Sequence, residues 1–537
     1  MFNKRSNEPE YALLNDVECQ TNNRYGKNID TTESAQQLRE QSFVINNEEQ
    51  QQQNPNRYKQ HGFYFNADNC IACHACESAC SEKNDNPAHL SFRSVGFVEG
   101  GTYPAYQRLN ISMACNHCDD PVCLKGCPTR AYTKFAEYGA VLQDPDICFG
   151  CGYCTWVCPY NAPQLDPVKG QVSKCNMCVD RLEVGLKPAC VSACLGNALD
   201  FGVIENIPEN RTQAKTSIPG FPDPSITHPN VRFQQTRTTH RDMNRVDSTA
   251  MKYHRSENNG EHKPELNTAL KTKKHWNLKQ LLSSHENAHI LFTLAAQAVM
   301  GAFALLIFLL NADTTWAISL KASGALNVIL PVLVLIQSFG LFKLNMHLGK
   351  PHRFYRGFYN LKWSPVSREI AGVSLFFTGL LIYTALHFIN LKFDVASFMQ
   401  DASIIAITGI LLGGYYMIKL YRIKARPFWN HWHTNASFVA SGFTLGASLL
   451  LISSLAFGLD LSSQLIAIAI FFGVSLELSA VIAHRNSSKN AHSEAALSYQ
   501  EQSSHYGYSF ILRNCLLVIS LLLSVALYLS PVSLSIS

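Results

Sequence analysis

The chain carries CIACHACESAC at residues 70–80, CNHCDDPVCLKGCP at 115–128, CFGCGYCTWVCP at 148–159, and CNMC at 175–178 followed by CVSAC at 190–194. These stretches contain all but two of the 18 cysteines, in four groups of four. The two remaining cysteines, Cys19 and Cys515, lie far from the groups. The arrangement predicts that the first part of the chain folds around its cysteines.

The spacing of the cysteines indicates which metal they bind. Cys-x2-Cys-x2-Cys-x3-Cys is the run found in bacterial ferredoxins, where the fourth cysteine ligates the other cluster of a pair. The first and third groups keep this spacing, and the second and fourth lengthen one gap. Pro128 and Pro159 follow the second and third groups as the pattern expects, whereas Ser81 and Leu195 stand after the other two. We therefore predict four 4Fe–4S clusters held by Cys70, Cys73, Cys76, Cys80, Cys115, Cys118, Cys123, Cys127, Cys148, Cys151, Cys154, Cys158, Cys175, Cys178, Cys190 and Cys194.

Two other uses of cysteine fit the pattern less well. Zinc sites also use Cys-x2-Cys, but they combine such pairs and rarely add a third cysteine two residues later. Disulfides need an oxidising compartment, and the sequence offers no export signal: it has no apolar segment with a cleavage site and no twin-arginine motif.

Composition divides the chain into four parts. We expect a disordered extension rich in Gln and Asn at 1–60, a ferredoxin-like cluster domain at 61–205, a polar linker at 206–284 and a membrane anchor at 285–537. The net charge of +5 is modest, and the basic residues form no stripe with aromatic side chains. This charge pattern argues against nucleic acid as a partner.

The last part of the sequence predicts a multi-pass membrane bundle. A run of about twenty apolar residues is the length that a helix needs to cross the hydrocarbon core of a bilayer. Such runs lie near 290–310, 325–345, 369–390, 402–421, 436–457, 463–483 and 510–530. The expected fold is therefore an α+β ferredoxin-like double domain followed by an all-α bundle of about seven spans.

Basic residues in the short loops predict the orientation of this bundle. The loops after the second, fourth and sixth spans carry Lys343, Lys350, Arg353, Arg356, Lys362, Arg368, Lys419, Arg422, Lys424, Arg426, Arg485, Lys489 and Arg513. The opposite loops are poor in Lys and Arg. We expect the basic side, and with it the cluster domain, to face the cytoplasm at a bacterial inner membrane.

Several motifs resemble those of dimethyl sulfoxide reductase-type complexes. The cluster domain resembles their iron–sulfur subunit, and the membrane part resembles their anchor subunit, so the chain looks like a fusion of two subunits. The motifs lie at 112–131, 158–164, 174–194 and 198–202 for the first, and at 347–358, 367–370 and 425–434 for the second.

The resemblance implies a function in anaerobic respiration, with electrons passing between membrane quinone (menaquinone or ubiquinone) and a separate molybdopterin catalytic subunit. It also implies crossed ligation: Cys70, Cys73 and Cys76 with Cys194; Cys175, Cys178 and Cys190 with Cys80; Cys115, Cys118 and Cys123 with Cys158; Cys148, Cys151 and Cys154 with Cys127.

Related anchors have eight spans where seven are expected here. Sulfite-oxidising complexes that face the cytoplasm share the anchor motifs, so the substrate and the direction of transfer stay open.

Ionisable residues near the ends of spans are candidates for a quinone site, because quinone chemistry moves protons with electrons. His347 and Glu369 match positions proposed for the family's quinol site, and Arg353 and Arg368 would neutralise charge there or keep Glu369 ionised. Glu477 lies inside the sixth span and is a further candidate. Structural roles, such as helix capping by His347 or hydrogen bonding by Glu477, are the alternatives.

Other function classes receive less support. We expect no haem, because His387 lies near the end of its span and His431 and His433 fall in a loop. A redox-driven ion pump would need several buried carboxylates and broken helices, and only Glu477 is available. A redox sensor would need a signalling domain and fewer clusters.

Overall fold

The computed structural model describes residues 57–204, 218–234, 239–245, 251–255, 262–267, 287–312, 315–390, 393–459, 464–488, 494–504 and 507–529. The predicted extension therefore lies almost entirely outside the described residues. The chain divides into two compact units, Met1–Leu270 and Lys271–Ser537. We call them the cluster unit and the membrane unit and describe each by itself.

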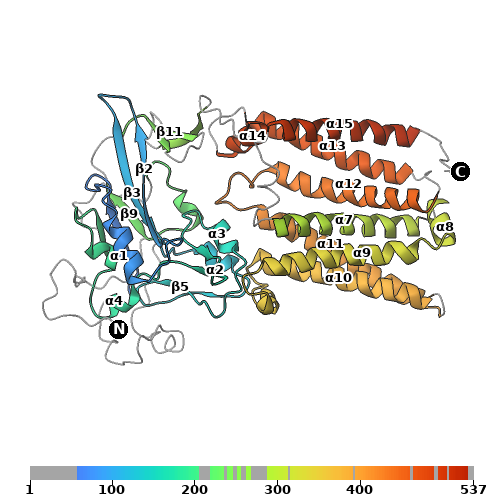
Figure 1. Ribbon diagram of the computed structural model, residues 1–537, viewed down its shortest axis with the longest axis horizontal. Helices are drawn as coiled ribbons and strands as arrows, with labels where there is room; N and C mark the ends of the chain where they lie inside the picture. Colours follow the sequence, from blue (N-terminus) through green and yellow to red (C-terminus); the bar gives the residue numbers. More distant parts are fainter. Residues whose placement is uncertain are drawn as a thin grey trace. The chain divides into compact units, whose positions relative to one another are not determined.

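A small sheet joins the two ends of the cysteine-rich region in the cluster unit (Figure 1). Strand β1 (His61–Asn66) pairs antiparallel with β8 (Leu199–Val203) and parallel with β9 (Val231–Gln234). Alternate side chains of these strands, among them Phe63 and Phe201, are buried and pack ring against ring. The sheet thereby fixes where the cysteine-rich segment begins and ends.

A second sheet is built on a long hairpin, and it includes residues that the sequence did not predict as strands. The hairpin consists of β2 (Arg93–Gly100) and β3 (Gln107–Ala114). It is extended by β10 (Asp242–Arg245), β11 (Met251–Arg255) and β12 (His262–Leu266), in the order β12-β11-β10-β2-β3.

The segment 206–284 thus differs from the expected polar linker, since its described residues contribute β9 to the first sheet and three strands to the second. Its few apolar side chains explain the difference. Met243, Met251 and Tyr253 are all buried, and the edge of β2 supplies backbone hydrogen-bonding partners for β10. A template strand and three well-placed apolar residues order a stretch whose average composition is polar.

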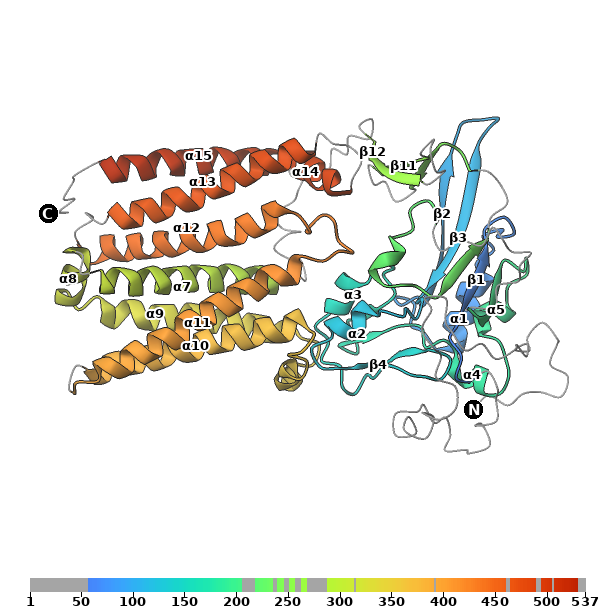
Figure 2. The same cartoon turned by 180° about the vertical axis from the view of Figure 1, so that it is seen from behind.

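Short helices contain or directly follow cysteines, and two hairpins lie between the cysteine groups (Figure 2). The helices are α1 (Ala75–Lys83), α2 (Val122–Gly126), α3 (Tyr153–Val157), α4 (Val179–Glu183) and α5 (Ala189–Ser192). The hairpins are β4 (Tyr132–Lys134) with β5 (Val141–Gln143), and β6 (Gln164–Asp166) with β7 (Gln171–Ser173). A 3-10 turn, η4 (Pro224–Ile226), precedes β9.

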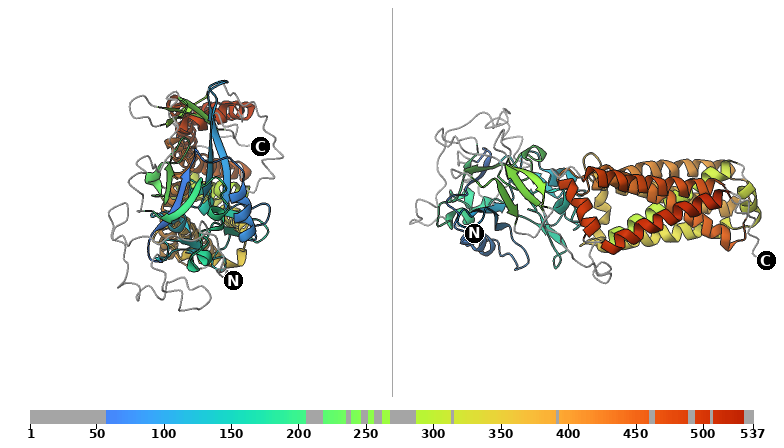
Figure 3. Two further views of the ribbon diagram at one scale, coloured as in Figure 1. Left: turned by 90° about the vertical axis from the view of Figure 1, so that its left-hand side faces the viewer. Right: turned by 90° about the horizontal axis from the view of Figure 1, so that it is seen from above.

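The described residues of the membrane unit include seven helices that are long and apolar enough to span a bilayer, which confirms the predicted fold. They are α7 (Asn287–Asn311), α9 (Leu326–His347), α10 (Pro365–Asn390), α11 (Ala396–Tyr421), α12 (Trp432–Ala456), α13 (Gln464–Ser487) and α15 (Gly507–Leu529). Figure 3 shows these helices running alongside one another. Shorter elements connect them: α8 (Thr315–Ala322), the 3-10 helix η5 (Pro351–Phe358) and α14 (Glu494–Ser504).

Glycines let neighbouring spans approach closely. A Cβ at Gly372 on α10 would overlap with the backbone of Gly413 on α11, and a Cβ at Gly301 on α7 would overlap with the backbone of Gly442 on α12. Lipid tails offer no hydrophobic drive for helices to associate, so close backbone packing of this kind holds a membrane bundle together. Gly414, by contrast, faces open space.

We predict that Gly372→Ala destabilises the bundle by about 1–3 kcal/mol, because the new methyl group forces α10 and α11 apart. Gly414→Ala is the matched control on α11 and should leave stability unchanged or raise it slightly, since alanine favours helix. Denaturant-induced unfolding of the full-length protein in detergent measures both. Equal stability of the two variants would show that the α10–α11 contact is not tightly packed.

Candidate functional site

Each cysteine group is built on a loop with left-handed backbone, followed by a short helix. Positive φ angles occur within or beside the Cys-x2-Cys segments at Ala72, His74, His117, Gly150, Gly152, Met177 and Cys178. Successive turns of this kind direct backbone N–H groups towards a shared centre, which suits an anionic metal–sulfur group. Several backbone N–H groups already donate to sulfur, among them Ala131 to Cys127 at 3.4 Å, Met177 to Cys175 at 3.4 Å and Leu199 to Cys194 at 3.3 Å.

The thiols gather in four sets, and each set combines three cysteines of one sequence group with one cysteine of another group. The electrostatic neighbours of Cys80 are Cys175, Cys190 and Cys178, and those of Cys70 are Cys194 and Cys73. We name four sets: set I is Cys70, Cys73, Cys76 and Cys194; set II is Cys80, Cys175, Cys178 and Cys190; set III is Cys115, Cys118, Cys123 and Cys158; set IV is Cys127, Cys148, Cys151 and Cys154. These are the sets that the family resemblance implied.

Cross-set neighbours arrange the four sets in a row. Cys76 of set I neighbours Cys190 of set II. Cys175 of set II neighbours Cys115 of set III, and Cys154 of set IV neighbours Cys123 of set III. The row has accessible ends, because Cys73 in set I is exposed and Cys151 in set IV is half-buried. The order is thus I, II, III, IV, and we call this row the cluster series.

The chemistry of the donors fits iron–sulfur clusters. All sixteen cysteines are free thiols, and no disulfide competes for them among the described residues. Burial, together with neighbouring thiols, raises the pKa of Cys175 and of Cys158 to about 11. Burial likewise raises the pKa of Cys80 and Cys151. Thiolates in these positions need a compensating positive charge, which iron supplies when bound.

Two buried cations lie between consecutive sets. Arg93 is 2% exposed and is surrounded by Cys190, Cys175, Cys76 and Cys80 of sets I and II. Its Nη1 donates to Ser112 Oγ at 3.1 Å, while Nε and Nη2 have no hydrogen-bond partner among the described residues. Burial lowers the pKa of Arg93 and the thiolates raise it, with a net increase that keeps it charged.

Lys174 has the corresponding place between sets II and III. Its Nζ donates to Cys115 Sγ at 3.4 Å, to the Cys175 carbonyl at 2.8 Å and to the Val141 carbonyl. Burial lowers and the thiolates of sets II and III raise the pKa of Lys174, again with a net increase. A side chain that contacts both sets holds positive charge where anionic clusters would be neighbours. The cysteine pattern drew attention to neither cation.

Comparison with known proteins identifies the family. A subunit of the anaerobic dimethyl sulfoxide reductase of Haemophilus influenzae is 40% identical over 182 residues, which cover 88% of that subunit and 32% of this chain. The protein belongs to the dimethyl sulfoxide reductase family. The subunit of the same name from Escherichia coli is 38% identical over 180 residues, covering 87% of that subunit and 32% of this chain.

Two family matches show that this member is a fusion. Residues 107–204 match the 4Fe-4S dicluster domain, and residues 282–535 match the DMSO reductase anchor subunit (DmsC). The chain is therefore an iron–sulfur electron-transfer subunit joined to its membrane anchor, in a multi-pass membrane protein. An anchor of this type implies a separate catalytic partner. A sulfite dehydrogenase subunit of Allochromatium vinosum is also similar, at 37% identity over 158 residues, which cover 66% of that subunit and 26% of this chain.

The predicted quinone residues of this family member do not all lie together. His347 ends α9, and its ring is 4.5 Å from that of His289 on α7. Glu369 lies near the start of α10, just after its first turn, and is half-buried. His347 and Glu369 lie at the same end of the bundle, because α9 ends and α10 begins there.

Of the two roles expected for the arginines, the described residues bear only on the pairing with Glu369. Arg368 donates from Nε to the Leu361 carbonyl at 2.8 Å and from Nη2 to the Lys362 carbonyl at 2.5 Å, so its guanidinium caps the preceding loop. Among the ion pairs of the described residues, none joins Glu369 to Arg353 or Arg368. Arg353 lies in η5, where its backbone N–H donates to the Lys350 carbonyl at 3.0 Å. Neither arginine holds the Glu369 carboxylate in this arrangement.

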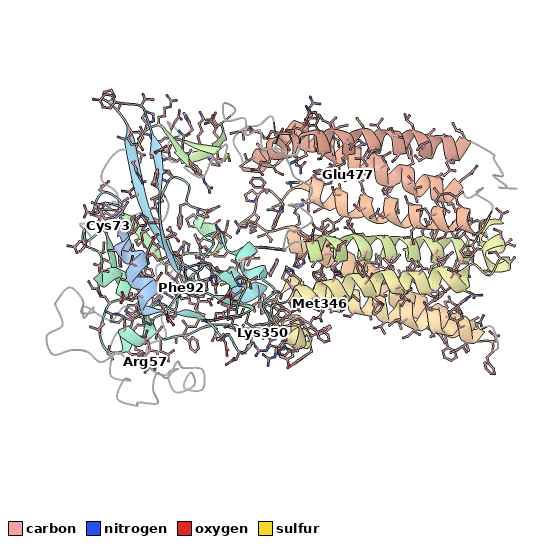
Figure 4. The ribbon with its side chains drawn as sticks, viewed as in Figure 1. Arg57, Cys73, Phe92, Met346, Lys350 and Glu477 are labelled. Carbon is pink, nitrogen blue, oxygen red and sulfur yellow. The ribbon has the colours of Figure 1, made fainter. Side chains whose placement is uncertain are left out.

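Glu477 belongs to a different part of the bundle. It is buried on α13, where its Oε2 accepts from Ser437 Oγ at 2.7 Å and its Oε1 accepts from Arg513. In Figure 4 it lies on the side of the bundle opposite to Met346 and Lys350, which flank His347. The structure thus separates Glu477 from the other quinone candidates.

Sequence reasoning missed the histidines beside Glu477. His433 was expected in a loop but lies in the first turn of α12, buried at 6% exposure, with Nε2 3.3 Å from Glu477 Oε1. His431 and His484 complete a group with it. The available signal was topological, since residues that begin the fifth span and end the sixth must share one end of an antiparallel helix pair.

We predict that Arg93→Gln lowers the reduction potentials of the clusters in sets I and II, because a buried positive charge favours the more negative, reduced form. Redox titration of the full-length protein followed by electron paramagnetic resonance measures the shift. Arg93→Lys keeps the charge and should retain potentials close to those of the parent. Identical potentials in the Gln and Lys variants, both away from the parent value, would assign Arg93 a packing role only.

Proposed function

We propose that this chain passes electrons between membrane quinone and a separate molybdopterin catalytic subunit through four 4Fe–4S clusters. The observation that supports this most strongly is the cluster series, in which each thiol set neighbours the next, in a chain that also carries its own membrane anchor. When bound, clusters of this type supply one-electron transfer at potentials set by charge and hydrogen bonding around the sulfur atoms. The role of the protein is to hold them in succession and to exclude water from them.

The set I end of the series has the features of a docking surface for the catalytic partner. Cys73 is exposed there, and Ile71 and Leu195, which neighbour ligands in the sequence, are 68% and 77% exposed. Exposed apolar side chains beside a redox centre favour a protein partner that covers both.

The proposed quinone site is formed by His347 and Glu369 at the end of α9 and the start of α10. Between them, the loop that contains η5 exposes the aromatic side chains Phe354, Tyr355, Tyr359 and Trp363. Aromatic residues of this kind are typical of the boundary between lipid and water. A histidine and a carboxylic acid at this depth exchange protons with water and contact a lipid-soluble headgroup, menaquinone or ubiquinone.

The cluster unit is placed on the cytoplasmic side of a bacterial inner membrane in this proposal. With seven antiparallel spans, the loops after α9, α11 and α13 share the end where α7 begins, and these loops carry the basic residues. Positively charged loops favour the cytoplasmic side.

The proposal uses no haem. The described histidines that come closest to one another, His431 and His484, stack face to face with ring centroids 4.3 Å apart. Two axial haem ligands instead direct their nitrogens at one iron from opposite sides.

A second candidate function is quinone reduction in a cytoplasmic sulfite-oxidising complex. It is favoured by the similarity to the sulfite dehydrogenase subunit and by the basic loops at the end of the bundle where α7 begins. Membranes that contain the complete complex distinguish the two, since the first oxidises a quinol analogue with dimethyl sulfoxide and the second reduces quinone with sulfite.

We predict that His347→Gln and Glu369→Gln each slow quinol-dependent cluster reduction in membranes by about 10²-fold, because each removes a group that exchanges a proton with the quinol. Dithionite reduces the clusters directly and should do so equally in all variants. Absorbance bleaching of the clusters follows both reactions.

His387→Gln is the matched control for this experiment. His387 lies at the other end of α10 and is hydrogen-bonded to Asn327 at 2.9 Å, so its loss should leave quinol kinetics unchanged. Parental quinol kinetics in both the His347 and the Glu369 variant would remove this assignment of the site.

A further inference from the structure

Three histidines meet at one end of the membrane unit, where α12 begins and α13 ends. His431 precedes α12, His433 lies in its first turn and His484 lies in the last turn of α13. One ring nitrogen from each lies within 4.8 Å of the other two. The rings are packed together, with centroids 4.3 Å apart for His431 and His484 and 5.3 Å apart for His433 and His484.

Ring nitrogens in this group lack partners among the described residues. His431 Nδ1 and His484 Nε2 are both inaccessible to solvent and have no hydrogen bond. Buried polar atoms are almost always satisfied, so two such atoms in one small cluster call for an explanation. A metal cation stabilises such an arrangement, because it binds the lone pairs of several imidazole nitrogens that face one another.

His433 differs because its Nε2 faces Glu477 Oε1 at 3.3 Å. An ionised carboxylate only accepts hydrogen bonds, so this contact places the imidazole proton on Nε2 and leaves the lone pair on Nδ1. Histidines that bind metals typically donate their second ring N–H to a carboxylate in this way.

Both carboxylate oxygens of Glu477 already accept hydrogen bonds from neighbouring side chains. One oxygen accepts from Ser437 Oγ at 2.7 Å and the other accepts from Arg513 as well as from His433. Arg513 balances the carboxylate charge, so the three imidazoles are left as neutral nitrogen donors. Glu477 therefore orients a ligand and need not be one itself.

We propose that His431, His433 and His484 bind one divalent transition-metal ion, and that zinc is the ion that fits best. Three imidazole nitrogens with a fourth position left for water are a common zinc environment, and zinc imposes no redox chemistry on its ligands. Nitrogens around tetrahedral zinc are separated by about 3.4 Å, and the separation of up to 4.8 Å seen here is within reach of small ring rotations. The ion would fasten the beginning of α12 to the end of α13.

This site is separate from the proposed quinone site and does not depend on it. The helix that bears Glu477 lies on the opposite side of the bundle from Met346 and Lys350 (Figure 4). The three histidines of the proposed zinc site lie at the start of α12 and the end of α13, outside the loop between α9 and α10.

The test is metal analysis of the full-length, cluster-loaded protein in detergent, after dialysis against a weak chelator and titration with Zn²⁺. Zinc and iron are measured together, so that zinc trapped at empty cysteine sites would reveal itself through missing iron. We expect one zinc per protein molecule at full iron content. His431→Gln and His484→Gln should each weaken zinc affinity at least tenfold with iron unchanged, and His387→Gln should bind zinc like the parent.

X-ray absorption at the zinc edge of the parent protein gives a result that does not depend on any variant. A first shell of nitrogen and oxygen with the outer scattering typical of imidazole supports the site, and sulfur scattering overturns it by assigning the zinc to cysteine. The proposal is also overturned if the fully iron-loaded parent binds no zinc, or if the His431 and His484 variants both bind zinc as tightly as the parent does.

Discussion

The gathering of sixteen thiols, most of them buried, in a small unit is the constraint on which the rest of the cluster unit depends. Thiolates in a low-dielectric interior repel one another and lose hydration, which is why burial and neighbouring thiols raise the pKa of cysteines such as Cys175 and Cys158. The arrangement is favourable only with iron to balance the charge. The protein adds fixed positive charges of its own at the boundaries between sets, from Arg93 and Lys174. Metal, thiol and buried cation form one electrostatic system.

The surrounding fold keeps this system in register. β1 pairs with β8 on one side and β9 on the other, which ties the residues before the first cysteine group to those after the last. Crossed ligation needs this closure, because Cys194 belongs with Cys70 at the opposite end of the cysteine-rich segment. In the membrane unit, close glycine contacts such as Gly372 against Gly413 provide the rigidity that the cluster unit obtains from metal ligation.

Sequence reasoning succeeded where the determining signal is local. Cysteine spacing is fixed by cluster geometry, and span length is fixed by bilayer thickness, so four cysteine groups and seven spans could be predicted from short stretches. It did not succeed where the signal depends on distant partners. Strands β10 to β12 form because an exposed edge of β2 is available, and their own composition is polar. Likewise, Arg93 is only one arginine in a strand until folding surrounds it with thiols from two groups.

The histidines beside Glu477 illustrate the same limit. His433 and His484 are 51 positions apart in the sequence, and only the antiparallel packing of α12 on α13 brings them together. Arg368 shows the converse, since one role expected of it was to keep Glu369 ionised, whereas the fold turns its guanidinium to the carbonyls of Leu361 and Lys362.

The most direct test of the central claim is the iron and acid-labile sulfide content of the anaerobically purified full-length protein, with Mössbauer spectroscopy to identify the cluster type. Four cysteine sets with four irons each predict about sixteen irons and as many sulfides per protein molecule, all in four-iron clusters. A content near twelve irons or fewer after complete anaerobic reconstitution, or zinc bound by cysteine in place of iron, would contradict the account.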